Sequence, residues 1–297
     1  MRKLENLSIK KNNVLKGSVY LNNNKKNIDK DEYMILHMSH NLSYKYALEK
    51  ESKVNLLKKF KSKFKKYRED WNLQPERCIQ EKSLGAQMKN QKIIPLCVDI
   101  EIASICDLAC PFCYREFIVT PDKIIDEKLC YDLIDQAADM GVPSMKFNWR
   151  GEPLLNPKIY DYINYAKKKG IIETIINTNA TNLTESNSKR LINSGLDLMI
   201  YSFDGGTKKT YEKMRPGRFS QNSFEKVYNN IKNFKRTRDE LGSKFPFTKI
   251  QMILTKDTIN EVNEFVNNFG DIVDNVSVNQ YTERGGDIKD LNEEEKE

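Results

Sequence analysis

Three cysteines lie close together in the stretch CDLACPFCYRE, at Cys106, Cys110 and Cys113. Thiolates are soft metal ligands, and three of them within eight residues can bind three irons of a cubane iron–sulfur cluster. The fourth iron is then open to a small molecule. A structural zinc site usually has four ligands in paired units, and no second such pair occurs in this sequence. The spacing therefore predicts a [4Fe–4S] cluster with one open iron.

The other three cysteines are isolated from this group. Cys97 and Cys130 fall on a predicted strand and a predicted helix, where a thiol packs as a small apolar residue, and Cys78 lies further upstream. The N-terminal sequence MRKLENLSIKKNN lacks the apolar run of a signal peptide, and no stretch approaches ~20 apolar residues. We therefore expect thiols or metal ligands instead of disulfides, a cytoplasmic location and no membrane-spanning helix.

The cysteine group must be positioned by the elements around it, and from residue 93 the sequence alternates between β-rich and amphipathic stretches. The predicted strands are 96–102, 144–149, 173–179, 196–203, 247–254 and 274–281. The predicted helices are 128–140, 157–169, 186–194, 223–241 and 259–269. Strands that alternate with helices at this spacing favour a parallel sheet with helices packed outside it.

Six such units fall short of the eight of a closed barrel. The fold class predicted for this region is therefore α/β, a partial (β/α)6 TIM-like barrel, with a flat doubly wound sheet as the alternative. The cysteine loop follows the first strand. Ligands of parallel α/β folds bind in the loops at the carboxyl ends of the strands, which is where this loop is expected.

Three further polar segments follow successive predicted strands. They are Arg150-Gly151-Glu152-Pro153, Thr178-Asn179-Ala180-Thr181 and Ser202-Phe203-Asp204-Gly205. Each segment alone is ordinary turn chemistry, because Asn, Asp, Ser, Gly and Pro are common in turns. Their order along one sheet edge, beside the cysteine loop, predicts a shared binding site.

These segments together resemble the radical S-adenosylmethionine (SAM) superfamily over roughly residues 96–285. The Cys-x3-Cys-x2-Cys loop is similar to the family's signature loop, in which the aromatic residue before the third cysteine, here Phe112, packs near the adenine of SAM. Gly151, Glu152 and Pro153 resemble the GGEP motif, which holds the SAM amino group. The first glycine of that motif is replaced by Arg150, so how closely the backbone approaches SAM is open.

The two later segments extend the resemblance. Thr178 and Asn179 lie in a segment similar to the family's TNGT segment, while Ser202 and Asp204 match its SxDG segment, whose polar groups approach the ribose or carboxylate of SAM. Residues 208–219 resemble the stretch that follows SxDG in enzymes with a C-terminal SPASM or twitch region. No cysteine follows Cys130 in this sequence, so either the protein does without the auxiliary clusters of that region or the sequence is a fragment of a longer chain.

The resemblance implies an enzyme that uses a [4Fe–4S] cluster and SAM. A one-electron donor, flavodoxin or ferredoxin, would reduce the cluster, and reductive cleavage of SAM would give a 5′-deoxyadenosyl radical for C–H activation. The predicted substrate is a small anionic metabolite, such as a nucleotide-linked sugar of surface glycan biosynthesis. Peptide maturation is the second enzymatic hypothesis, and an Fe–S electron-transfer or binding module is the non-enzymatic one. Neither a membrane nor nucleic acid is an expected partner.

Arginines at the predicted strand ends are candidates for binding an anionic substrate. Arg150 and Arg284 could clamp a phosphate or a carboxylate, because guanidinium groups bind such anions in a bidentate manner. The alternative is that they form ordinary ion pairs at the edge of the sheet.

The N-terminal third differs in charge from the rest. Residues 1–90 contain 21 Lys and Arg against 10 Asp and Glu, whereas residues 91–297 contain 28 against 32. We predict a basic, partly helical extension over 1–92 and the barrel over 93–297. An apolar stripe at helical spacing runs through 44–71 and is expected to dock on the barrel: Val54, Leu57, Phe60, Phe64, Tyr67 and Trp71. The alternative is that the surrounding lysines attract an anionic partner.

Overall fold

The computed structural model describes residues 19–21, 66–67, 69–70, 73, 94–117 and 121–281. Its centre is a sheet in which six strands run parallel in the order β7-β6-β5-β4-β3-β2. These strands are β2 (Cys97–Asp99), β3 (Ser144–Lys146), β4 (Glu173–Thr178), β5 (Leu198–Ser202), β6 (Phe247–Leu254) and β7 (Asn275–Gln280). A short strand, β1 (Val19–Leu21), pairs antiparallel with β7. The sheet confirms the predicted parallel α/β fold.

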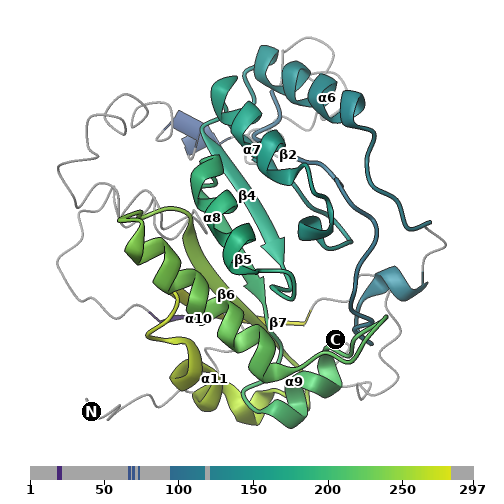
Figure 1. Cartoon of the computed structure of the whole chain (residues 1–297), viewed down its shortest axis with the longest axis vertical. Coiled ribbons are helices and arrows are strands. Elements are labelled where there is room, and N and C mark those ends of the chain that lie inside the picture. The colour runs from purple at the N-terminus through teal and green to yellow at the C-terminus, as the bar shows by residue number, and fades with distance from the viewer. Residues whose placement is uncertain are drawn as a thin grey trace.

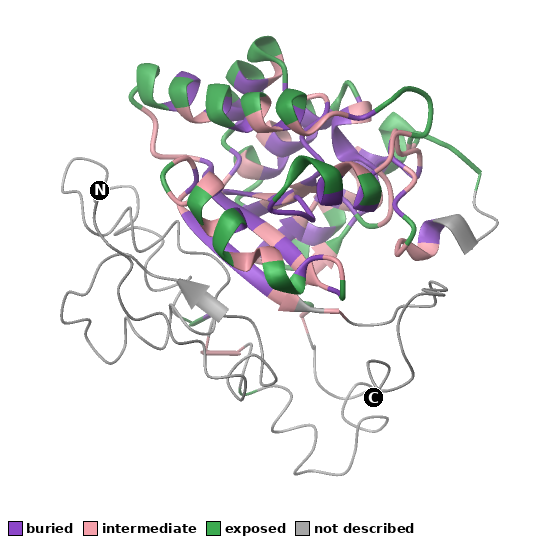
Figure 2. Ribbon diagram, turned by 90° about the horizontal axis from the view of Figure 1, so that it is seen from below, coloured by how far each residue is buried: buried purple, intermediate pink, exposed green. Residues whose placement is uncertain are grey.

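Helices alternate with these strands. They are α6 (Glu127–Asp139), α7 (Ile159–Lys168), α8 (Glu185–Ser194), α9 (Lys208–Met214), α10 (Phe224–Glu240) and α11 (Val262–Phe269), with 3-10 turns η1 (Tyr114–Phe117), η2 (Pro153–Leu155) and η3 (Ile259–Glu261). Figures 1 and 2 show α7, α8 and α10 lying over one face of the sheet. With six parallel strands, the first five of which are each followed by a described helix, the architecture is the partial (β/α)6 barrel that the sequence predicts.

Several helices begin at a residue whose side chain caps the first turn. Asp126 and Ser223 accept hydrogen bonds from backbone N–H groups in the first turns of α6 and α10, and Thr184 does so for α8. Gly195 ends α8 with a φ of 87°, a left-handed conformation that costs glycine little. These signals explain why the predicted boundaries of α6, α8 and α10 lie within about one residue of the observed ones.

Alternate residues of each strand pack against the helices. Met199 and Tyr201 of β5 belong to the buried core, as does Phe203 directly after the strand. The Tyr201 ring meets Phe234 of α10 edge to face at 6.4 Å. Ile250 of β6 lies in the same core. Because side chains alternate along a strand, the residues between them face the opposite, inner side of the sheet. That inner face carries most of the polar strand residues.

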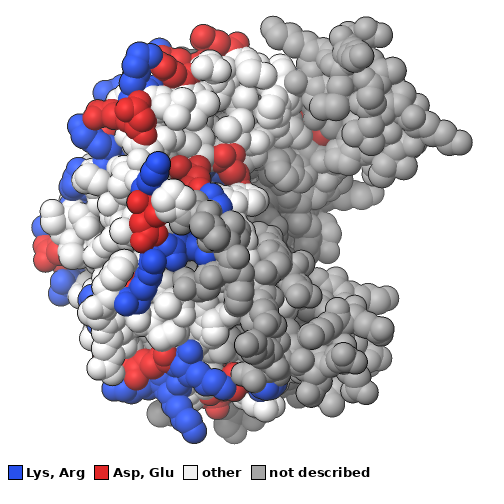
Figure 3. Space-filling view, turned by 90° about the vertical axis from the view of Figure 1, so that its right-hand side faces the viewer, with Lys and Arg blue, Asp and Glu red and all other residues white. Residues whose placement is uncertain are grey.

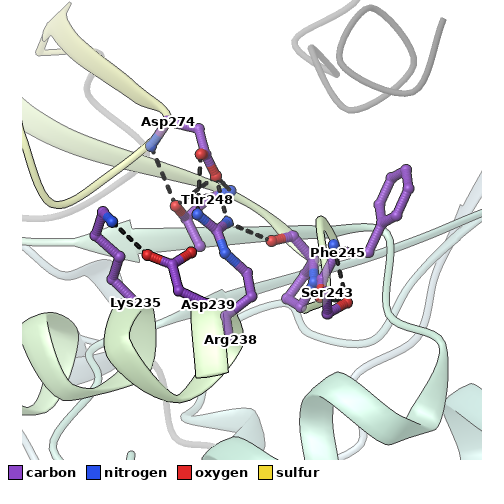
Figure 4. A network of polar contacts seen from close by, with 8 residues as sticks. Lys235, Arg238, Asp239, Ser243, Phe245, Thr248 and Asp274 are labelled. Atoms are coloured by element: carbon purple, nitrogen blue, oxygen red, sulfur yellow. Dashed lines mark hydrogen bonds and ion pairs between the residues drawn. The ribbon is translucent and has the colours of Figure 1, made fainter. Parts of the chain in front are cut away.

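An ion-pair network joins α10 to the amino-terminal ends of β6 and β7 (Figure 4). The buried Arg238 donates to Asp274 Oδ2 at 2.5 Å and to Asp274 Oδ1 at 3.0 Å. Asp274 also accepts from the backbone N–H and the hydroxyl of Thr248, each at 2.8 Å. The network stabilises the amino-terminal edge of the sheet. The predicted site lies at the opposite, carboxyl-terminal edge.

Two predicted strands are shorter than expected. The pairing of β2 stops at Asp99 instead of residue 102, and that of β3 stops at Lys146 instead of residue 149. Beyond these points the chain makes single hydrogen bonds, from Ile100 N to Lys146 O at 2.8 Å and from Phe147 N to Ile175 O at 2.9 Å. The backbone then leaves the sheet to form the cysteine loop and the segment after β3. Helix α9, within the stretch 208–219, was not predicted as a helix.

The described part of the N-terminal region includes Tyr67 of the predicted apolar stripe. Its side chain is 4% exposed, and its hydroxyl donates to Glu173 Oε2, at the start of β4, at 3.2 Å. Ser144 of β3 donates to the same oxygen at 3.0 Å. This contact agrees with docking of the stripe on the barrel. The other stripe residues and the lysines around them lie outside the described residues, and the division at 92/93 stays a prediction.

Replacing Tyr67 with phenylalanine is therefore expected to destabilise the protein. The change removes one donor from a buried carboxylate while keeping the ring, and a hydrogen bond to a charged group contributes about 1.5–3 kcal/mol. Urea unfolding of the Tyr67→Phe variant should show this loss, whereas Tyr228→Phe, in the partly buried ring cluster of α10, should cost less. Equal stability of Tyr67→Phe and the unaltered protein would contradict docking through this contact.

On the face seen in Figure 3, basic and acidic side chains lie next to one another. Within the described residues, no helix combines the length and apolar character needed to cross a bilayer.

Candidate active site

The cysteine loop lies directly after β2, at the carboxyl edge of the sheet. Cys110 is buried, Cys106 and Cys113 are half-buried, and the Cys113 N–H donates to the Cys110 carbonyl at 3.0 Å. The loop after α9 holds this segment in place. Ala109 N donates to Pro216 O at 2.9 Å, and Arg218 N donates to Asp107 O at 2.8 Å. The segment 208–219 therefore supports the cysteine loop physically.

Two polar side chains approach the cysteine sulfurs. Asn179 Nδ2 lies 3.9 Å from Cys106 Sγ, and Arg215 Nη1 lies 3.9 Å from Cys110 Sγ. Burial raises the pKa of the Cys106 and Cys110 thiols to about 12. Donors and a positive charge at this distance favour the thiolate, which is the form that binds metal. They oppose the effect of burial, which by itself keeps the unligated thiols protonated.

The residues present fit a cluster better than a single metal ion. Among the described residues, no three His, Cys, Asp or Glu side chains are grouped so that they could hold one ion. In a cubane cluster each cysteine binds a different iron, so the three sulfurs need not converge on one point. A loop that offers three cysteines and no converging fourth ligand is compatible with a cubane and unsuited to closed zinc coordination.

Gly151 is required by a close approach of two backbones. A Cβ at this position would lie 2.2 Å from the carbonyl oxygen of Ala103 and 2.5 Å from that of Ile105. The next N–H, that of Glu152, donates to Ile105 O at 2.8 Å. The segment after β3 is thereby fastened to the start of the cysteine loop, and any side chain at position 151 would separate them.

The Glu152 carboxylate is buried behind this contact, with the residue 2% exposed. Its Oε1 accepts from the Thr178 hydroxyl at 2.6 Å and from Leu154 N at 3.0 Å, and its Oε2 accepts from Asn179 N at 2.8 Å. Burial raises the pKa of Glu152 to about 7, while these donors oppose the shift. Pro153 follows as the first residue of η2, which Glu152 caps.

The end of β4 links Glu152 to the cysteine loop. Besides the backbone bond to Glu152, Asn179 donates through Nδ2 to Asp107 Oδ1 at 2.7 Å. Thr181 donates to the other oxygen of Asp107. Asp107 lies between the first two cysteines of the loop. Thr178, Asn179 and Glu152 are thus brought together as predicted, next to Cys106.

Asp204, which is predicted to contact SAM, is buried among protein partners, and its contact with SAM stays a prediction. It is 1% exposed; its Oδ2 accepts from Arg215 Nε at 2.8 Å and Nη2 at 2.5 Å, and its Oδ1 accepts from Ile253 N at 2.7 Å. Both oxygens are therefore engaged by protein groups. Asp204 orients Arg215, whose guanidinium also lies 5.7 Å from the centre of the Phe112 ring. Ser202, half-buried, ends β5 at the same edge.

Of the two strand-end arginines, Arg150 forms an ion pair at the sheet edge. Its Nε donates to Glu101 Oε1 at 2.8 Å and its Nη2 donates to Glu101 Oε2 at 2.5 Å. This arrangement matches the ion-pair alternative. Arg284 lies outside the described residues.

Three residues of the site were not singled out from the sequence: Asp107, Thr181 and Arg215. Asp107 and Thr181 belong to motifs that are recognisable in the sequence. The hydrogen bond between them could not be predicted from those motifs. Arg215 lies in the segment 208–219, and a buried arginine 11 residues from its carboxylate partner leaves no periodic signal.

Fold and site together define a partial α/β barrel with a thiol-rich loop at the carboxyl ends of its strands. Residues 100–268, more than half of the chain, match the Radical SAM superfamily, and the chain belongs to that superfamily. Members of the superfamily use a [4Fe–4S] cluster and SAM, which confirms the predicted cofactors and the enzyme class at family level.

The matches to individual relatives cover only part of this chain and part of each relative. The chain is 27% identical over 172 residues to the tungsten-containing aldehyde ferredoxin oxidoreductase cofactor-modifying protein of Pyrococcus furiosus, with 56% of this chain and 45% of the relative covered. It is 32% identical over 125 residues to a GTP 3′,8-cyclase of Chlorobaculum tepidum, with 42% and 38% covered. A PqqA peptide cyclase of Streptomyces rochei is 29% identical over 99 residues, with 33% and 27% covered. The chain thus spans less than half the length of these curated relatives.

Among solved structures, the Streptococcus suis protein SuiB bound to its precursor peptide SuiA has a similar fold. The TM-score is 0.54 at 21% sequence identity, with 90% of this chain and 60% of SuiB covered. The similarity supports the fold of the barrel.

Proposed function

We propose that this protein is a radical SAM enzyme in which Cys106, Cys110 and Cys113 bind the cluster and the edge formed by β3, β4 and β5 binds SAM. When bound and reduced, the cluster would supply the electron that cleaves SAM. The observation that carries the proposal is the buried Glu152 carboxylate beside the cysteine loop. We propose that this carboxylate, in its ionised form, binds the SAM amino group.

The hydrogen bonds of Glu152 leave room for one more donor. An ionised carboxylate has about four lone-pair positions, and three are used by Thr178, Leu154 and Asn179. An ammonium group at the remaining position would be a charge-assisted contact and would offset the cost of burying the negative charge. The proposed ligand therefore completes an electrostatically unfinished site.

The other residues of the site have positioning roles in this proposal. Asn179 orients Asp107 and approaches Cys106, which keeps the loop next to Glu152. Arg215, oriented by Asp204, places a positive charge beside Cys110. Phe112 and Ser202 flank the same edge and are proposed to contact the adenosyl part of SAM.

The proposed substrate is a small anionic metabolite, and C–H activation is the proposed chemistry. The name of the GTP cyclase among the relatives supports a nucleotide-like substrate, whereas the name of the peptide cyclase supports the peptide alternative, as does the SPASM-like segment 208–219. A radical SAM enzyme needs an electron donor, and we propose flavodoxin or ferredoxin for that part.

The function is tested by incubating the anaerobically reconstituted, dithionite-reduced protein with SAM and measuring 5′-deoxyadenosine by chromatography. We expect the product to form, and to form faster when the substrate is present. Extracts divided into small-molecule and protease-sensitive peptide fractions show which substrate class stimulates the reaction. Reduced, cluster-loaded protein that binds SAM and forms no 5′-deoxyadenosine would contradict the enzymatic proposal and favour an electron carrier.

Replacing Glu152 with alanine should weaken SAM binding without removing iron. Loss of a contact to a charged group costs about 1.5–3 kcal/mol, or about ten- to a hundredfold in affinity. Equilibrium binding of SAM to the reconstituted variant measures this, with iron content as the internal control. Glu152→Gln keeps the shape of the side chain but loses its charge, and should be weakened similarly. A folded Glu152→Ala variant with unchanged SAM affinity would show that the amino group binds elsewhere.

A further inference from the structure

Arg215 is a buried cation next to the cysteine loop, and the residue is 7% exposed. Its Nη1 lies 3.9 Å from Cys110 Sγ and donates a hydrogen bond to that sulfur. The guanidinium also lies 5.7 Å from the centre of the Phe112 ring, which is within the range of a cation–π contact. One charged side chain thus contacts two residues of the loop, and one of these is a proposed ligand of the cluster.

The backbone of Arg215 is held on both sides. Arg215 N donates to Tyr211 O at 2.8 Å at the end of α9, and Asn222 Nδ2 donates to Arg215 O at 2.9 Å. Asn222 Nδ2 also donates to the Tyr211 hydroxyl at 3.0 Å, and the Tyr211 ring is stacked on that of Phe203 with centres 3.9 Å apart. A packed segment therefore presents the guanidinium to Cys110, so the contact does not depend on a flexible surface side chain.

Asp204 pairs with this cation on a different edge. Its Oδ2 accepts from Nε and Nη2 of Arg215, whereas Nη1 faces the sulfur of Cys110. The side chains of Arg215 and Asp204 are 9% and 1% exposed, so dissolved ions screen the pair little. The pair is therefore a fixed dipole beside the loop, and its positive end lies at Cys110.

A charge at this position changes how readily an iron–sulfur cluster accepts an electron. Reduction adds negative charge to the cluster and its thiolates, so a hydrogen bond to a ligating sulfur and a cation beside it favour the reduced form. A nearby anion favours the oxidised form for the same reason. Because Coulomb interactions are stronger in poorly solvated surroundings than in water, Arg215 and Asp204 are expected to act on the potential in opposite directions.

We propose that the Asp204–Arg215 pair sets the reduction potential of the cluster. Arg215 raises the potential, which makes the cluster easier for a one-electron donor to reduce. Asp204 limits that rise, so that the reduced cluster still gives its electron to SAM. Both are positioning residues in this role, since they act through the sulfur of Cys110. The inference rests on the proposed function, because it assumes that Cys110 ligates the cluster.

The test is a potentiometric titration of the reconstituted protein without SAM, followed by electron paramagnetic resonance of the reduced cluster. Arg215→Met should shift the midpoint potential to more negative values, and Asp204→Asn should shift it to more positive values. The double variant Asp204→Asn/Arg215→Met should lie between the two single variants. Arg215→Lys keeps the positive charge and should recover part of the shift seen in Arg215→Met.

The matched control is Arg218→Met, which removes a cation from the same segment. Arg218 pairs with Asp122 at 2.8 Å, and its side chain is 32% exposed, so its loss should leave the potential close to that of the unaltered protein. Iron content per chain shows which variants still hold the cluster. Asp204→Asn keeps the shape of the side chain and one acceptor oxygen, and its positive shift decides the outcome if Arg215→Met does not retain iron.

The signs of the shifts decide between a tuning role and a merely structural one. Shifts of opposite sign in Arg215→Met and Asp204→Asn support the proposal. Shifts of the same sign, or no larger than that of Arg218→Met, overturn it, because a loosened site does not respond to the sign of the charge removed. 5′-Deoxyadenosine formation by the unaltered protein separates the two claims. Its absence with opposite shifts would refute the proposed function alone, and its presence with potentials that ignore the pair would refute this inference alone.

Discussion

Replacing Cys106, Cys110 and Cys113 together with alanine is expected to abolish iron binding. The unaltered protein, reconstituted anaerobically, should be brown and hold about four irons per chain, because three thiolates bind three corners of a [4Fe–4S] cluster. The triple variant has no other group of cysteines in the described residues to replace them. It should therefore lose the charge-transfer absorbance in the visible range, and reductive cleavage of SAM with it.

The control for this experiment is Cys97→Ala. Cys97 lies on β2, outside the cysteine loop. Its removal should leave iron content and absorbance unchanged. A full cluster in the triple variant, or zinc alone in the unaltered protein, would refute the assignment of the loop.

Asp204→Ala should be the most destabilising single substitution at the site. It removes both hydrogen-bonded oxygens from a fully buried pair, leaving the Arg215 charge uncompensated and the Ile253 N–H without its acceptor. Breaking a buried ion pair on one side costs about 3–5 kcal/mol, because the remaining charge stays in a poorly solvated environment. Urea unfolding measures the loss.

Two comparisons keep this prediction specific. Glu185→Ala breaks an exposed pair with Lys189 and should cost less than about 1 kcal/mol. The double variant Asp204→Leu/Arg215→Met removes both charges and should recover part of the stability lost in Asp204→Ala, while it no longer places a cation beside Cys110. An Asp204→Ala variant as stable as Glu185→Ala would show that the pair does not hold the site together.

The protein partners of Asp204 could not be predicted from the motif that contains it. The segment Ser202-Phe203-Asp204-Gly205 was expected to approach SAM as a unit, and the structure does place it at the correct edge. The carboxylate nevertheless points to Arg215 and the β6 backbone. Which way a side chain points at the end of a strand depends on its neighbours in space, and a motif does not contain that information.

The sequence by itself determined the alternation of strands and helices, the parallel sheet and the position of the cysteine loop after the first parallel strand. These features follow from local periodicity and from residues close in the chain, such as the capping residues Asp126 and Thr184 and the stop at Gly195. It also placed Gly151, Glu152, Thr178 and Asn179 at one edge, because parallel strands bring their carboxyl ends together.

Only the tertiary structure decided which of these side chains meet. The bond between Thr178 and Glu152 spans 26 residues, the Arg150–Glu101 pair spans 49 and the contact of Asn179 with Asp107 spans 72. The contact of Arg215 with Cys110 likewise spans 105 residues and exists only because the segment after α9 packs on the cysteine loop. Such contacts could not be predicted, because local periodicity indicates which face of an element is buried and not which distant residue it meets.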